Sequence, residues 1–278
     1  MLKLSKVFLY DEPSVPEIKI EGLGEFIKEK FCVEVEIRDR FFEFFKDPTR
    51  KIAYDLAASR IFNPLIPFEK HVPASEEVTF EENSFTNVTN TSNIVMYDGF
   101  EFKQIIANAI PQSESQSDMF HLICTDKLTC TYDYDDYRYH GRAVICSNPA
   151  IISTTGMIEA PAKPREYYLK MFENISQGLN LDVLKNQFKG KYLEYHDVKL
   201  SEIIKGYAMQ ALFYYLTGKP FCESKDCKLY NAHWQEDLLH SQIISNKLCS
   251  QHQKVLDDIF NYLKNCSDQA SPKVKGLP

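Results

Sequence analysis

The sequence contains no apolar run of the roughly 18 to 20 residues that a membrane span needs, because charged residues interrupt every candidate segment. It also has no excess of positive charge, since 39 acidic residues outnumber 32 basic ones and give a formal net charge of -7. Nucleic-acid binding depends on a surplus of Lys and Arg near the phosphates. The composition therefore predicts neither a membrane protein nor a nucleic-acid-binding protein.

A secretory signal is not expected, because the N-terminal stretch MLKLSKVFLYDEPS turns acidic after Tyr10. This predicts a cytoplasmic protein. In a reducing compartment, the eight cysteines are expected to be free thiols or metal ligands rather than disulfides. The 278 residues are 44% hydrophobic and 26% charged, which is typical of a globular protein.

The N-terminal part, residues 1–117, has the pattern of an α/β protein. Residues 6–10 and 33–38 predict strands on either side of a helix over 23–31, which makes a β-α-β unit. A further helix is expected to be capped by Asp47, with Pro48 in its first turn. Residues 63–95 are rich in Pro, Asn, Thr and Ser and predict a long polar surface connection with at most one strand, before a helix over 102–109.

The second part, residues 118–267, begins with three expected strands and continues with helices. The strands cover 119–126, 128–135 and 141–148, and their tight links predict antiparallel or mixed pairing. Residues 149–164 are expected to be irregular, and 165–175 and 180–188 to be helical. Apolar residues at intervals of three and four predict a long helix over 199–216, ended by Gly218 and Pro220. Residues 268–278 are expected to form a flexible tail.

After the long helix, the sequence has the pattern C-x4-C … C-x2-H, formed by Cys222, Cys227, Cys249 and His252. Four sulfur and imidazole donors in two close pairs are typical of a tetrahedral structural zinc site. The first pair flanks the turn ESKD, and the second stands at i and i+3 in the first turn of an expected helix. Two other interpretations stay open: a disulfide between Cys222 and Cys227, and four unliganded residues in a packed hairpin.

A second set of donors lies between the two pairs. If the segment 232–248 is helical, His233, Glu236 (or Asp237) and His240 share one face and could bind a second metal ion. The alternative is that these histidines lie on the rim of a buried face that includes Trp234 and Leu238.

Other candidate donors are expected to have no metal role. Cys124, Cys130 and Cys146 lie in expected strands, where they would be small buried hydrophobic residues. The turn DYDDYRYH, residues 133–140, lacks the carboxylate spacing of a calcium loop. It is interpreted as a solvated hairpin tip.

From about residue 118 to 264, the sequence resembles the archaemetzincins, a branch of the metzincin zinc peptidases, and related archaeal proteins described only as metallopeptidases. That family places the helix motif H-E-x-x-H-x-x-G-x-x-H directly before C-x4-C-x-M, with C-x2-C downstream. Aligned without a gap, Cys222 and Cys227 match the first cysteine pair and Gly218 matches the glycine. Cys249 and His252 match the last pair, with two extra residues in the spacer and His in place of Cys. The resemblance implies an α/β fold in which a metzincin-like mixed sheet packs on long helices, with a C-terminal zinc-knuckle subdomain.

The same alignment places the family's three catalytic histidines at Ala211, Tyr215 and Phe221, and the general-base glutamate at Leu212. Ala and Phe offer no lone pair, and a phenol with a pKa of about 10 is a poor zinc ligand at neutral pH. Without a carboxylate at position 212, no group there can take a proton from a metal-bound water. The resemblance therefore implies a structural zinc ion without the catalytic one.

Three functional hypotheses follow. The first is a zinc-stabilised relative that has lost peptidase activity and binds a peptide or protein along the edge of its sheet. The second is an active zinc-dependent hydrolase with a relocated metal, held by His233, Glu236 and His240 or by His196. The third is a structural interaction module whose metal only joins the C-terminal helices. The sequence predicts no oligomeric state.

Overall fold

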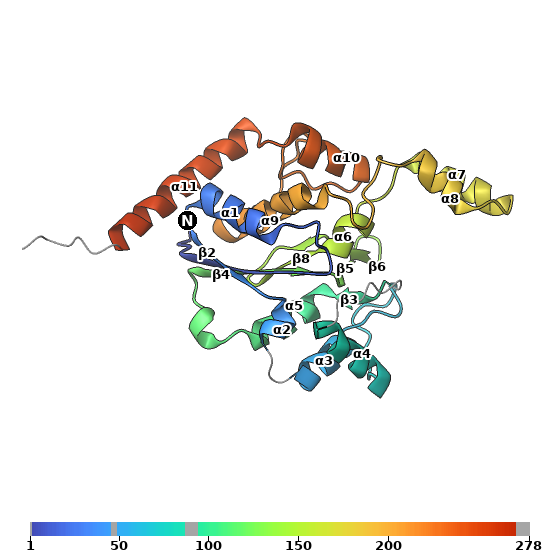
Figure 1. Cartoon of the computed structure of the whole chain (residues 1–278), viewed down its shortest axis with the longest axis horizontal. Coiled ribbons are helices and arrows are strands. Elements are labelled where there is room, and N and C mark those ends of the chain that lie inside the picture. The colour runs from blue at the N-terminus through green and yellow to red at the C-terminus, as the bar shows by residue number, and fades with distance from the viewer. Residues whose placement is uncertain (1, 46–48, 87–93, 271–278) are drawn as a thin grey trace, which may run out of the picture.

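The computed structural model describes residues 2–45, 49–86 and 94–270 (Figure 1). Within these residues the chain forms two mixed β-sheets with helices packed around them. The expectation of an α/β protein is thereby confirmed. The expected helix cap at Asp47 and Pro48 lies outside the described residues.

The larger sheet has five strands in the order β2-β1-β4-β8-β7. Their bounds are β1 Lys6–Tyr10, β2 Glu34–Arg38, β4 Met119–Thr125, β7 Val144–Ile145 and β8 Ala150–Ser153. The first four strands in this order are parallel, and β7 pairs antiparallel to β8. This sheet contains strands from residues 1–117 and from residues 118–267. The boundary between these two parts therefore passes through a single sheet.

Both faces of this sheet are buried, which explains why β1 is almost continuously apolar. Val7 and Leu9 belong to the main core cluster on one face, whereas Phe8 and Tyr10 belong to a second cluster on the other. The strand β4 alternates in the same way, with Leu122 on the first face and Ile123 on the second.

Helices cover each face of the sheet (Figure 1). On one face lie α1 Ile20–Phe31, α9 Leu200–Thr217, α10 Gln235–Leu239 and α11 Ser250–Ala270. On the other lie α2 Phe41–Phe44, α3 Thr49–Ala58, α4 Ser75–Thr86 and α5 Gly99–Ala109. The helix α9 buries 12 of its 18 residues because it lies between the sheet and the outer helices. It ends at Gly218, whose φ of 76° is the left-handed cap that the sequence predicts.

The smaller sheet has the order β3-β5-β6, with β3 Met96–Asp98, β5 Leu128–Asp133 and β6 Arg138–Gly141. The strand β5 pairs antiparallel with β6. The third expected strand, 141–148, does not form as one strand, because β6 ends at Gly141 and β7 pairs with β8 in the larger sheet. The expected pairing of β4 with β5 is wrong, although only Asp126 and Lys127 separate them. Both edges of β4 are already occupied, by β1 and by β8, so the chain must leave the first sheet to form β5.

Two segments expected to lack regular structure contain it. The polar connection 63–95 includes α4, which buries Val78, Glu81 and Phe85 at helical spacing. The segment 149–164 includes β8 and the short helix α6 Thr154–Glu159, whose first turn is capped because Ser153 Oγ accepts a hydrogen bond from the Gly156 N–H at 2.8 Å. These elements form because their apolar residues meet distant parts of the chain, which local composition does not reveal.

The remaining helices are α7 Arg165–Ser176 and α8 Leu181–Gln187, which form a projecting hairpin, the 3-10 turn η1 Gln112–Glu114 and the π-helical segment η2 His240–Ser245. The helix α11 continues to Ala270, so the tail expected over 268–278 begins as helix, and residues 271–278 lie outside the described part. Within the described residues, no helix combines the length and apolar composition that crossing a membrane requires.

Candidate metal centre

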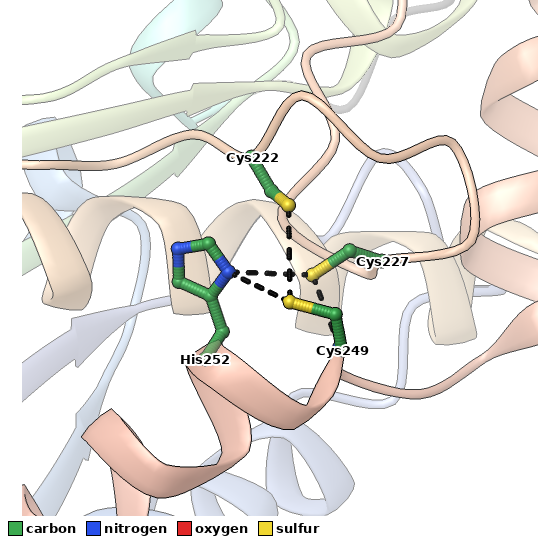
Figure 2. Close-up of side chains that lie close together, drawn as sticks. All are labelled: Cys222, Cys227, Cys249 and His252. Atoms are coloured by element: carbon green, nitrogen blue, oxygen red, sulfur yellow. Dashed lines mark hydrogen bonds between the residues drawn. The ribbon is translucent and has the colours of Figure 1, made fainter.

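The structure brings Cys222, Cys227, Cys249 and His252 together, with their donor atoms all within 4.8 Å of one another (Figure 2). The Sγ atoms of Cys222 and Cys249 are 3.9 Å apart, and His252 Nδ1 lies 3.8 Å from Cys227 Sγ and 3.1 Å from Cys249 Sγ. Zinc bonds of about 2.3 Å to sulfur and 2.0–2.1 Å to nitrogen place tetrahedral donors about 3.8 Å (S–S) and about 3.6 Å (S–N) apart. The four side chains therefore fit a tetrahedral zinc ion, and all four donors are protein atoms.

The first cysteine pair is held by a tight loop after α9. The Cys222 N–H donates to the Leu229 carbonyl at 2.9 Å, and the Tyr230 N–H donates to the Cys227 carbonyl at 2.9 Å. The Ser224 N–H also donates to Cys222 Sγ at 3.4 Å. This hydrogen bond orients the sulfur. Neither cysteine of this pair is in a disulfide.

The second pair stands at the start of α11, as the sequence predicts. Cys249 directly precedes the first helical residue, and its carbonyl accepts a hydrogen bond from the Gln253 N–H at 2.8 Å. His252 follows one turn later, so both side chains point to the same side of the helix (Figure 2). The Cys249 N–H donates to Cys227 Sγ at 3.4 Å, which links the two pairs directly.

The surroundings of Cys227, Cys249 and His252 shift their pKa values in different directions. Burial raises the pKa of the Cys227 thiol to about 12. Burial also opposes ionisation of Cys249, but hydrogen bonds from the His252 backbone and from the thiols of Cys227 and Cys222 lower its pKa. Burial lowers the pKa of His252 and so favours the neutral imidazole, the form that binds a metal. A zinc ion at this centre would displace the thiol protons.

The cluster is continuous with the main hydrophobic core. Cys227 is fully buried in the core cluster that contains Leu229 and Ile259, and the rings of Phe213 and His252 pack 6.1 Å apart. A metal ion here would therefore join the loop after α9 to the N-terminal turn of α11, next to side chains that already pack together.

The positions that match catalytic residues in the archaemetzincin alignment hold no metal donors. Ala211 and Leu212 are fully buried in the main core. The Tyr215 ring packs 4.9 Å from that of Phe120, and its hydroxyl donates to the Ser117 carbonyl. The fourth aligned position, Phe221, lies after the end of α9 and is exposed. Packing accounts for the first three of these residues.

The second set of sequence candidates does not come together. His233 precedes α10, which begins at Gln235, so His233, Glu236 and His240 do not share a helical face. His240 Nε2 instead lies 2.7 Å from Asp226, and His196 Nδ1 lies 3.2 Å from Glu17. None of these residues belongs to a cluster of three or more metal donors in the described part of the chain.

A further cluster of possible metal donors lies in residues 133–140, where the sequence predicts a solvated hairpin tip and no metal site. Asp133, Asp136 and His140 place one donor each within 4.8 Å at the turn between β5 and β6. Asp136 already pairs with Arg138 at 2.7 Å and with His140 at 2.8 Å. These contacts account for the cluster without a metal, in agreement with a solvated hairpin tip.

The fold and the cluster define an α/β protein with a Cys3His centre of zinc-site geometry. The chain belongs to a family described as a probable metallopeptidase family (DUF6775), whose model matches residues 3–259. Among solved structures, it is similar to a zinc-dependent peptidase from Methanocorpusculum labreanum (strain Z), with 12% identity and a TM-score of 0.41 over 91% of this chain and 100% of that chain. No curated protein matches the sequence. The expected relation to metallopeptidases is thus confirmed for the family as a whole, not for the archaemetzincin branch.

Proposed function

We propose that this protein is a zinc-binding member of the metallopeptidase family in which the ion is structural and peptidase activity has been lost. One observation carries the proposal: three sulfurs and one imidazole converge as a closed set of four donors. Structural zinc sites are closed in this way, whereas catalytic sites keep one position for water or substrate.

The lack of metal-binding side chains at the aligned catalytic positions on α9 supports the same conclusion. A catalytic zinc needs three protein ligands and a base beside its water. Ala211, Leu212 and Tyr215 provide none of these, and they pack as core residues. The relocated-metal hypothesis lacks support as well, because His233, Glu236 and His240 do not converge.

In this proposal, the zinc ion holds the C-terminal region together. It ties Cys222 and Cys227 to Cys249 and His252, which come from a different element, and thereby closes the intervening segment that contains α10 and η2. When bound, the ion supplies cross-linking and no Lewis-acid chemistry, because no coordination position is left for a substrate.

A peptide or protein partner fits the open edge of the larger sheet. The strand β2 is at that edge and pairs only with β1 in the described part of the chain. An extended peptide can add to such an edge through main-chain hydrogen bonds. The partly exposed Ile37 on this strand would contact one of its side chains.

Metal analysis of the purified protein tests the proposal directly. We expect one zinc ion per chain, lost in Cys222→Ser and retained in the matched control Cys266→Ser, whose cysteine lies on α11 outside the cluster. Peptide libraries should stay uncut with zinc or cobalt added. Two tightly bound zinc ions per chain, or chelator-sensitive peptide cleavage, would contradict the proposal.

A further inference from the structure

The α7–α8 hairpin presents an apolar surface that no described part of the chain covers. Its exposed side chains are those of Leu169, Phe172, Ile175, Leu179 and Val183, each 53–66% exposed. The three residues on α7 follow one another at i, i+3 and i+6 and so lie along one side of the helix. The hairpin projects away from the two sheets (Figure 1), so this surface is open to another molecule.

These exposed residues are not needed to hold the hairpin together. Its two helices pack through a small separate cluster that contains Tyr167, Leu184 and Phe188. The Tyr167 and Phe188 rings meet edge to face at 5.5 Å, and Lys170 Nζ reaches Gln187 Oε1 across the hairpin at 3.5 Å. The hairpin therefore has its own inner contacts, and the outer apolar residues are available for a partner.

The charges on the hairpin argue for a protein partner rather than a membrane. Acidic side chains at Glu166, Glu173 and Asp182 are interspersed with basic ones, whereas a membrane-binding helix carries mainly Lys and Arg on its polar face. The whole chain has a formal net charge of -7, which an anionic lipid surface would repel. Charges of both signs beside an apolar stripe suit a contact with a copy of the same surface.

We propose that two copies of this chain associate through their α7–α8 hairpins. Five side chains of this size and exposure leave on the order of 500 Å² of apolar surface per copy. A two-fold contact that covers all of them would remove at most roughly 1,000 Å² from water, the lower end of what a specific interface needs. A two-fold contact also uses the same surface on both copies and closes the assembly at a dimer. Phe172, the aromatic residue of the stripe, is the anchor of this contact.

Sedimentation velocity and light scattering of the full chain test the association. We expect a species of about twice the 32.3 kDa chain mass at micromolar concentration. Phe172→Asp should weaken the association about 30-fold or more, as loss of an aromatic anchor does. The matched control is Phe100→Asp, which places the same charge at an exposed phenylalanine on α5 and should leave the dimer intact.

Hydrogen exchange localises the contact. Amides in residues 165–187 should gain protection with rising protein concentration in the wild type, and not in Phe172→Asp. Leu169→Lys provides a second variant, and equal melting temperatures show that both variants are folded. Both variants should keep their zinc. A failure of the dimer proposal can therefore be distinguished from a failure of the metal proposal.

Three results would overturn the dimer. The first is a wild-type monomer at every concentration, and the second is a dimer that Phe172→Asp leaves unchanged. The third is a monomer that sediments with phosphatidylserine vesicles and loses this property in Phe172→Asp, which would assign the surface to membrane binding.

Discussion

Removal of zinc should destabilise the protein without unfolding it at room temperature. The four ligands join only the loop after α9 to α11. Of the four, only Cys227 is a buried member of a core cluster, so most apolar contacts of the parallel strands remain without the ion. A ligand at 1,000 times its dissociation constant stabilises the native state by about 4 kcal/mol. With an unfolding entropy of about 2.1 cal/mol/K per residue, a chain of this length should lose about 7 °C in melting temperature.

The assay is calorimetry before and after chelation, with metal content measured on the same samples. The melting temperature should fall on chelation and recover on addition of one equivalent of Zn²⁺. Cobalt should restore it too and give the visible absorption of a tetrahedral thiolate site. Hydrogen exchange should rise first in the 222–227 loop and in the first turn of α11, because these are the segments that the ion joins.

The matched variants separate the metal from the loss of a thiol. Cys222→Ser should melt at a lower temperature and no longer respond to the chelator, whereas Cys266→Ser should respond as the wild type does. If the metal is fully removed and the melting temperature changes by less than about 1 °C, the zinc ion does not stabilise this fold and the structural role is refuted.

Two further predictions concern the core. Burial lowers the pKa of His121 in the folded protein, so the unfolded chain binds a proton at this histidine more readily. The free energy of unfolding should therefore be unaffected by His121 above the unfolded pKa of about 6.5. It should decrease as the pH falls from there toward the lower pKa of the folded protein. His121→Gln should flatten the slope of melting temperature against pH in this range, and an unchanged slope would contradict the assignment. A Cβ at position 156 would collide with the Arg142 carbonyl oxygen, so Gly156→Ala should cost about 1–3 kcal/mol in urea unfolding. Gly22 lies in helix α1, where an added Cβ would have its nearest neighbour, Lys19 Cβ, 3.9 Å away. Gly22→Ala should therefore raise the free energy of unfolding by about 0.5–1 kcal/mol. Equal effects of the two substitutions would refute the steric argument.

Local sequence patterns were reliable where a single element explains them. The apolar spacing over 199–216 predicted α9, and Gly218 predicted its end, because helix periodicity and the left-handed cap are properties of adjacent residues. The apolar run at Lys6–Tyr10 likewise predicted a strand. Pairing between elements was less predictable: β4 and β5 follow each other in the chain yet lie in different sheets.

The sequence by itself determined the identity of the four candidate metal ligands and the lack of zinc ligands at Ala211, Leu212 and Tyr215, since residue type decides which atoms can bind zinc. Only the tertiary structure decided that Cys227 and Cys249, 22 residues apart, meet at one point. It also decided that His233 and His240 do not, and that the apolar residues of the α7–α8 hairpin face outward. Distances between remote residues depend on how whole elements pack, and that packing is set by the combined burial of many side chains.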